Sequence, residues 1–372
     1  MLKYMIRLLF KIFVFLSCWT VFSANAANIA VIAPKVGHLA KYGNEMIEGA
    51  QIAVDVINEK GGILGEKINL VIIDDRCEDS FAVSAAQMIT LNSNKNDKMN
   101  LVIGPYCNNS FAEISDIYSR GKVMRIVPLP LNESESNFQA KGLLKIGGVV
   151  SKQAETFFEF YKNNMVGKNV AMVYDKTLPQ TVETALKVQQ LFRENGLNNL
   201  TLFDFVSYED FETMAKEILL NNSIVYMLGS AKNMAVLAQE IQQQKAETIF
   251  FIDEYSANEY FYREMGNFAE GIYVISLKNM NDSPNFAEDL VGLRLKQKEP
   301  KGLGVYGYAA VKMWAEAVKN TKSFEFDKLN SIFEGKTFAL PWGNVQIKDG
   351  KSPLEDGYII YQIRNGEYVT VN

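Results

Sequence analysis

The 372-residue sequence is poor in histidine and cysteine, which many catalytic and metal sites use. Its single histidine, His38, cannot build a metal site of several histidines, and it argues against a Ser-His-Asp triad. No Cys-x-x-Cys pair and no GxSxG, HExxH or P-loop sequence occurs. We therefore expect a protein that is not an enzyme and holds no metal and no cofactor, with His38 an exposed loop residue.

Basic runs with interleaved aromatic residues are also absent, and the formal net charge is −5. A nucleic-acid partner is therefore not expected. Beyond the first residues, no apolar stretch approaches the length of about 20 residues that a bilayer span needs. An apolar content of 48% in a chain of this length is enough for two hydrophobic cores.

Residues 1–26 have the three parts of a secretory signal peptide: a positively charged start, an almost wholly apolar stretch over 12–22, and small residues at 24–26. We predict that export removes this segment. The mature chain then has 346 residues (372 − 26) and a formal charge of −8 (−5 − 3), because three basic residues leave with the signal. Retention as a membrane anchor and lipid attachment at Cys18 stay open as alternatives.

Short apolar runs alternate with longer amphipathic ones along the chain, which is typical of parallel, doubly wound α/β sheets. Two such series follow one another, with a break near 147–148, and a third block over 302–372 adds a helix at Tyr308–Val318 and a strand at Tyr358–Ile363. The expected strands are Asn28–Pro34, Ile68–Asp74, Leu101–Gly104, Met124–Pro128, Leu144–Gly147, Asn169–Tyr174, Leu200–Val206, Ile224–Leu228, Thr248–Ile252 and Ile272–Ser276.

Two of the three cysteines, Cys77 and Cys107, come just after predicted strands. If these strands are parallel neighbours, the cysteines meet at the carboxyl edge of the sheet, where open α/β folds bind ligands. In an exported protein, such a pair favours a disulfide over a metal site or a nucleophile.

Four further patterns have both a bland and a functional interpretation. The glycines of 302–307 match GxGxxG, but a charged loop precedes them instead of a strand, so we interpret them as allowing a tight start to the following helix. The pair Asp74-Asp75 fits turn capping better than catalysis. Glu254, at a strand end and followed by aromatic residues, is either a solvated loop glutamate or a partner for a ligand ammonium. Asn108 and Asn109 precede a helix, whose exposed amides attract carboxylates.

The segment that opens with Tyr42-Gly-Asn-Glu and ends with Ile-Ile-Asp-Asp75 resembles the opening of the type I periplasmic binding proteins. The subgroup that it resembles most is the leucine/isoleucine/valine-binding proteins of ABC transporters, whose disulfide the pair of cysteines also matches. The resemblance covers nearly the whole mature chain and continues at 102–105, 173–176, 270–271, 308–311 and 357–363.

This resemblance implies two Rossmann-like lobes with parallel sheets, joined by three crossover segments and closing on a ligand by a hinge motion. Lobe 1 would comprise 27–147 plus 277–349, and lobe 2 would comprise 148–276 plus 350–372. The implied function is that of a periplasmic, monomeric solute-binding protein that delivers a small, amino-acid-like molecule to an ABC permease in the inner membrane. The alternative is a regulatory or scaffolding protein that keeps this fold and binds a protein partner.

Carried over one by one, the family's ligand-binding positions match this sequence only in part. The aromatic wall corresponds to Tyr42, and the acidic partner of the ammonium corresponds to Glu254. Asn108 replaces a serine, the segment 128–131 brings two prolines to a carboxylate-holding stretch, and two tyrosine positions are also replaced. These departures favour another amino acid, an amide or a more apolar metabolite over leucine. The candidate ligand-binding residues are Tyr42, Asn108, Asn109, Leu129, Leu131, Pro179, Ser230 and Glu254.

Overall fold

The structure, a computed structural model, describes residues 26–37, 39–91, 98–107, 110–244, 247–278, 283–351 and 357–371. Predictions for Asn108, Asn109, His38 and Cys18, and for the signal peptide apart from Ala26, lie outside the described residues. Within these ranges, no helix is both long and apolar enough to cross a membrane.

The first lobe is built on a five-stranded sheet whose strands are all parallel, in the order β2-β1-β3-β4-β5. Every residue of the interior strand β1 is buried, as its mostly apolar run predicts. The strands are β1 (Ala27–Ile32), β2 (Ile68–Ile73), β3 (Met99–Ile103), β4 (Met124–Val127) and β5 (Leu143–Lys145). The helices of this lobe are α2 (Ala40–Glu59), α3 (Asp79–Leu91), α4 (Phe111–Arg120), α5 (Glu133–Asn137), α11 (Ala287–Leu295), α12 (Gly304–Thr321) and α13 (Phe326–Phe333), with the hairpin β11 (Thr337–Leu340) and β12 (Gly343–Gln346).

The second lobe holds a seven-stranded sheet in the order β14-β13-β10-β9-β8-β6-β7. Strands β6 to β10 are parallel, and β13 and β14 add an antiparallel edge. The strands are β6 (Val170–Asp175), β7 (Leu200–Phe205), β8 (Ile224–Leu228), β9 (Ile249–Asp253), β10 (Tyr273–Leu277), β13 (Tyr358–Arg364) and β14 (Glu367–Val371). The helices are α6 (Ser151–Asn164), α7 (Pro179–Glu194), α8 (Phe211–Asn221), α9 (Ala231–Gln243) and α10 (Glu259–Met265), with 3-10 turns at Tyr208–Asp210 and Gly266–Ala269.

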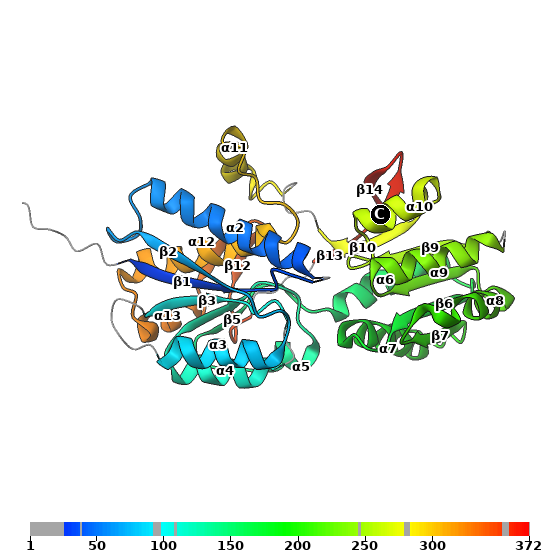
Figure 1. Ribbon diagram of the computed structural model, residues 1–372, viewed down its shortest axis with the longest axis horizontal. Helices are drawn as coiled ribbons and strands as arrows, with labels where there is room; N and C mark the ends of the chain where they lie inside the picture. The colour runs from blue at the N-terminus through cyan, green and yellow to red at the C-terminus, as the bar shows by residue number, and fades with distance from the viewer. Residues whose placement is uncertain are drawn as a thin grey trace, which may run out of the picture.

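Figure 1 shows the two lobes side by side, the first at the left and the second at the right. The chain crosses between them after β5, again after β10, and a third time before β13, so the predicted fold of two Rossmann-like lobes joined by three crossovers is confirmed. Every predicted strand is present, with ends that differ by at most two residues. The residue numbers at which the lobes divide stay a prediction.

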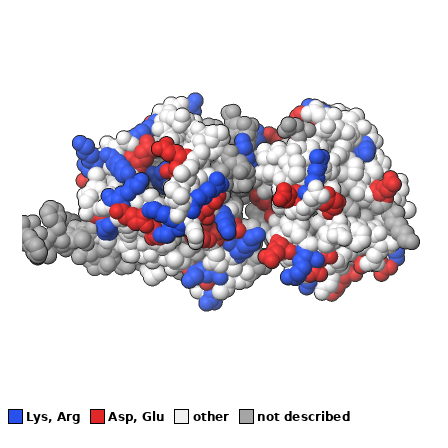
Figure 2. All heavy atoms as spheres, turned by 90° about the horizontal axis from the view of Figure 1, so that it is seen from above, with Lys and Arg blue, Asp and Glu red and all other residues white. Residues whose placement is uncertain are grey.

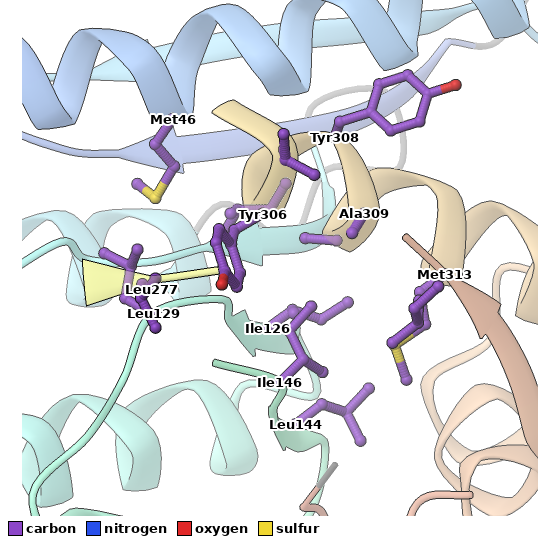
Figure 3. Close-up of a cluster of buried hydrophobic side chains, with 14 of the residues drawn as sticks. Met46, Ile126, Leu129, Leu144, Ile146, Leu277, Tyr306, Tyr308, Ala309 and Met313 are labelled. Atoms are coloured by element: carbon purple, nitrogen blue, oxygen red, sulfur yellow. The ribbon is translucent and has the colours of Figure 1, made fainter. Parts of the chain in front are cut away.

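Helices α2 and α12 pack closely on one face of the first sheet, and glycines make this approach possible. A Cβ added at Gly49 would lie 1.8 Å from the carbonyl oxygen of Gly304, and one at Gly307 would lie 2.2 Å from that of Met46. Two glycines of the GxGxxG pattern therefore belong to a helix–helix contact. Figure 3 shows the core beneath it, where Tyr306 and Met313 of α12 face apolar side chains of β4 and of the segment that follows β5.

Candidate functional site

A cavity with a volume of about 750 Å³ lies between the lobes. Figure 2 shows the surface hollowed between the two lobes. The walls of the cavity include the segments that follow β1, β2, β3 and β4 in the first lobe and those that follow β6, β9 and β10 in the second. The carboxyl ends of both sets of parallel strands thus face one another across it, which is the ordinary ligand site of open α/β sheets.

The predicted disulfide between Cys77 and Cys107 is present, with the two Cα atoms 5.2 Å apart, and both cysteines line the cavity. The neighbouring aspartates cap turns, as we interpreted them from the sequence. The carboxylate of Asp74 accepts hydrogen bonds from the backbone N–H of Lys35 and of Arg76, at 3.1 and 3.0 Å. Asp75 is fully buried and accepts one from the N–H of Cys77 at 3.2 Å.

Glu254 follows β9 directly and lines the cavity. Its carboxylate accepts hydrogen bonds from the backbone N–H of Leu277, at 3.1 Å, and from the Tyr358 hydroxyl, at 3.4 Å. Burial is the main cause that raises the pKa of Glu254 to about 7, and the neighbouring Asp253 raises it further. A ligand cation at this carboxylate would favour its charged form, since opposite charges lower the pKa of an acid.

Asp253, the last residue of β9, supports the same corner of the second lobe. It is 2% exposed, and its carboxylate accepts hydrogen bonds from the Ser256 N–H at 2.8 Å and the Ser256 hydroxyl at 2.6 Å. Burial raises its pKa to about 7 as well. These bonds shape the turn after β9, so Asp253 holds the backbone that carries Glu254 instead of facing a ligand.

Tyr42, near the start of α2, forms an aromatic wall with two other tyrosines. Its ring stacks on that of Tyr106, with centroids 6.2 Å apart, and meets the ring of Tyr255 edge-on at 5.9 Å. Its hydroxyl donates to the backbone carbonyls of Glu254 and Tyr255, each at 3.4 Å. Because Tyr42 and Tyr106 belong to the first lobe and Tyr255 to the second, this cluster spans the cleft.

Three more tyrosines line the cavity and were not predicted from the sequence: Tyr306 from α12, Tyr361 from β13 and Tyr368 from β14. Tyr106 was likewise missed, although it stands next to a candidate cysteine. Its position next to Cys107 could have suggested Tyr106 as a candidate binding residue. Nothing in the local pattern distinguishes the other three from ordinary core aromatics, because only the fold brings them together.

The candidate residues divide according to where the structure places them. Leu129 lines the cavity together with Pro179, which is the first residue of α7. Leu131 is 1% exposed and packs in a small apolar cluster with Phe111 instead of lining the cavity. Ser230 also stands away from the cavity wall and caps α9, where its hydroxyl accepts a hydrogen bond from the N–H of Asn233 at 3.3 Å.

Charged side chains of both signs line the same space. The acidic ones besides Glu254 are Glu45, which accepts a hydrogen bond from the Leu303 N–H at 3.1 Å, and Glu135, which completes the cap of α5. The basic ones are Lys41, Lys278 and Lys301. Among the described residues, no group of three or more His, Cys, Asp or Glu side chains could hold a metal ion. The cavity therefore offers partners for a ligand with both a positive and a negative group.

Two α/β lobes with a ligand-sized cavity at their facing sheet edges define a two-lobed binding protein. A family model described as "Periplasmic binding protein" matches residues 26–367, and the chain belongs to this family. The Leu/Ile/Val-binding protein of Escherichia coli strain K12 is 29% identical over 295 residues, which are 77% of this chain and 78% of that protein.

Solved structures have the same fold. A leucine binding protein from Thermotoga maritima superposes with a TM-score of 0.78 at 21% identity, covering 93% of this chain and 98% of that one. A solute binding protein from R. palustris, solved in complex with benzoate, gives a TM-score of 0.75 at 16% identity, covering 93% and 96%.

Proposed function

We propose that this protein is the periplasmic solute-binding component of an ABC importer, and that it binds an amino acid or a related small molecule between its lobes. Membership of the periplasmic binding protein family and the predicted signal peptide support this assignment. The observation that carries it is the carboxylate of Glu254, held at the cavity wall by two hydrogen-bond donors and next to an aromatic cluster. The protein acts by binding and not by catalysis.

Glu254 is the proposed partner of the ligand's ammonium group. A cation beside a half-buried carboxylate gains a charge-assisted hydrogen bond, which is stronger than a bond between neutral groups. Tyr42, Tyr106 and Tyr255 form the apolar wall for the rest of the ligand. This division of roles resembles the general plan of small-molecule sites, in which a few polar groups orient a ligand within an apolar cavity.

A ligand carboxylate would need its partners elsewhere on the wall. Pro130 has no backbone N–H to give, and the position after Cys107 is Asn108 instead of serine. Lys41, Lys278 and Lys301 are the cations that line the cavity. We therefore propose an amino-acid-like ligand other than leucine, whose acidic group, if it has one, meets a lysine.

A thermal-shift screen tests this proposal with the mature protein. The panel contains the L-amino acids, their amides, simple amines and organic acids, each at millimolar concentration. A compound present at 100 times its Kd stabilises a protein by about 2.7 kcal/mol, which gives a shift of several degrees. We expect at least one amine-containing compound to produce such a shift.

Glu254→Gln removes the proposed charge with little change in size and should reduce the shift markedly. Glu217→Gln is the matched control, because Glu217 is exposed on α8 in the same lobe. A panel without any stabilising compound would contradict the proposal. An unchanged shift in Glu254→Gln would contradict the role of this carboxylate. Slower uptake of the identified solute by cells that lack the protein would support the import function and the ABC permease as partner.

A further inference from the structure

Arg125 occupies a place in the first lobe where an apolar side chain would be expected. It lies in β4 opposite Val102 of β3, and all four residues of β4 are buried. The arginine itself is 1% exposed and lies near Phe111 and Ser115 of α4. A buried charge is costly unless hydrogen bonds compensate for it. The hydrogen bonds of this guanidinium therefore show which parts of the lobe it holds together.

These contacts are made with the turn Gly104–Cys107, which follows β3, and with the first residues of α4. The Arg125 Nε donates to the backbone carbonyl of Gly104 at 2.8 Å, immediately after β3. Its Nη1 donates to the carbonyl of Phe111 at 3.2 Å, at the start of α4, and to the hydroxyl of Ser115 at 2.6 Å. The Ser115 hydroxyl donates in turn to the Phe111 carbonyl at 2.6 Å, and the guanidinium also lies 4.6 Å from the centre of the Phe111 ring.

The turn Gly104–Cys107 carries cavity residues of the first lobe. Tyr106 stacks on Tyr42 there, and Cys107 forms the disulfide that ties the turn to the segment after β2. The disulfide therefore holds the Cys107 end of the turn, while Arg125 joins its Gly104 end to the start of α4. A planar guanidinium can reach both carbonyls at once, which a single ammonium group cannot do with the same geometry.

We propose that Arg125 is a positioning residue for ligand binding: it joins the Gly104 end of the Gly104–Cys107 turn to the start of α4 and thereby sets Tyr106 and Cys107 at the cavity wall. The inference rests on the proposed function for the statement that this turn meets a ligand. The clamp itself needs no ligand, so it can be tested apart from that function.

The test is hydrogen–deuterium exchange of the mature protein, followed by mass spectrometry of peptides that cover residues 104–111. Arg125→Met keeps an unbranched, flexible side chain, although a shorter one, and removes every donor. Trp314→Phe is the control, because Trp314 is fully buried in α12 and its truncation loosens the core of the same lobe without touching the turn. Both variants are compared with the wild type at the same temperature below their unfolding transitions.

We expect exchange of the turn to become at least tenfold faster in Arg125→Met and to stay unchanged in Trp314→Phe. This difference should hold even if the melting temperatures of the two variants fall by similar amounts. Arg125→Lys keeps the positive charge but not the planar, forked set of donors. Its turn should therefore exchange faster than that of the wild type and more slowly than that of Arg125→Met. Unchanged exchange of the turn in Arg125→Met, or equal acceleration in Trp314→Phe, would overturn the proposal.

Two milder variants cover the case that Arg125→Met does not fold. Ser115→Ala removes one acceptor of the guanidinium and should accelerate exchange of the turn less than Arg125→Lys does, but measurably. Wild-type exchange in both Ser115→Ala and Arg125→Lys would then overturn the clamp. A ligand screen that fails while Arg125→Met accelerates the turn would count against the proposed function and leave the clamp standing.

Discussion

The hydroxyl of Tyr42 in the first lobe donates a hydrogen bond to the backbone carbonyl of Glu254 in the second, across 3.4 Å. This contact joins the aromatic wall to the turn that carries the candidate ammonium partner. It also spans the two bodies that a hinge motion would bring together.

Tyr42→Phe removes the hydroxyl and keeps the ring. A hydrogen bond of this length contributes about 1 kcal/mol or less, so we expect the Kd of the ligand found in the screen to rise by about twofold to fivefold while the melting temperature stays nearly constant. Titration calorimetry measures the change. Tyr260→Phe, at a partly exposed position on α10, is the control and should leave the Kd unchanged. Equal Kd values for Tyr42→Phe and wild type would show that the interlobe bond does not contribute to the bound state.

The raised pKa of Glu254 gives the folding stability a pH dependence of known sign. The carboxyl titrates at about 7 in the folded protein and at its ordinary value of 4.5 when unfolded, because burial disfavours the charged form. The folded state thus holds the proton more tightly. The contribution of this group to stability is greatest below about pH 4.5 and is lost as the pH rises to about 7.

Glu254→Gln should therefore be more stable than wild type at pH 8, by about 3 kcal/mol, and the difference should vanish towards pH 4.5. Urea unfolding of the ligand-free proteins across this range provides the measurement. The same substitution is expected to weaken ligand binding, so stability and function should change in opposite directions. A wild type that is the more stable protein at pH 8 would show that Glu254 is ionised and favourably paired without ligand.

Much of the fold could be predicted from the sequence, because buried parallel strands are continuous apolar runs separated by amphipathic helices. Strand β14 was missed, since its exposed residues at the sheet edge carry no such run. The short hairpin of β11 and β12 was missed as well, because two strands of four residues give little periodicity.

The candidate site was only partly predictable. Cys77, Cys107 and Glu254 stand at strand ends, where topology alone places them at the sheet edge. The tyrosines of α12, β13 and β14 reach the cavity from the last third of the chain, and no local pattern marks them. Arg125 is the opposite case. A charge within the apolar run 124–127 is visible in the sequence, but its role could be inferred only from the structure, which places it beneath the turn.

The disulfide should stabilise the first lobe through the loop that it closes. Cys77 and Cys107 are 30 residues apart, and in the chain-entropy model a loop of this size contributes about 3–4 kcal/mol. The double variant Cys77→Ser/Cys107→Ser should lose about this much free energy of unfolding. Denaturant unfolding of the variant, compared with the wild type with and without a reductant, measures it. A double variant as stable as the oxidised wild type would contradict the bracing role of the disulfide.

The contact between α2 and α12 predicts that alanine substitutions at two glycines will differ sharply in their effect on stability. Gly307→Ala would place a Cβ 2.2 Å from the Met46 carbonyl oxygen, so the helices must separate, at a cost of about 1–3 kcal/mol or more. Gly292→Ala in α11 is the control, because nothing lies within 4 Å of its added Cβ. That change should be neutral or stabilise by up to about 1 kcal/mol. Thermal melts that fail to separate the two variants would contradict the close packing of these helices.

The central claim is that Glu254 binds the ammonium group of a small ligand between the lobes. Titration calorimetry tests it most directly, with the best amine from the screen and its analogue that lacks only the amino group, against wild type and Glu254→Gln. Because loss of a charged hydrogen-bond partner costs about 1.5–3 kcal/mol or more, the amine should bind Glu254→Gln at least 10-fold more weakly, and the analogue should bind both proteins weakly and alike. Equal affinity of the amine for both proteins would contradict the claim.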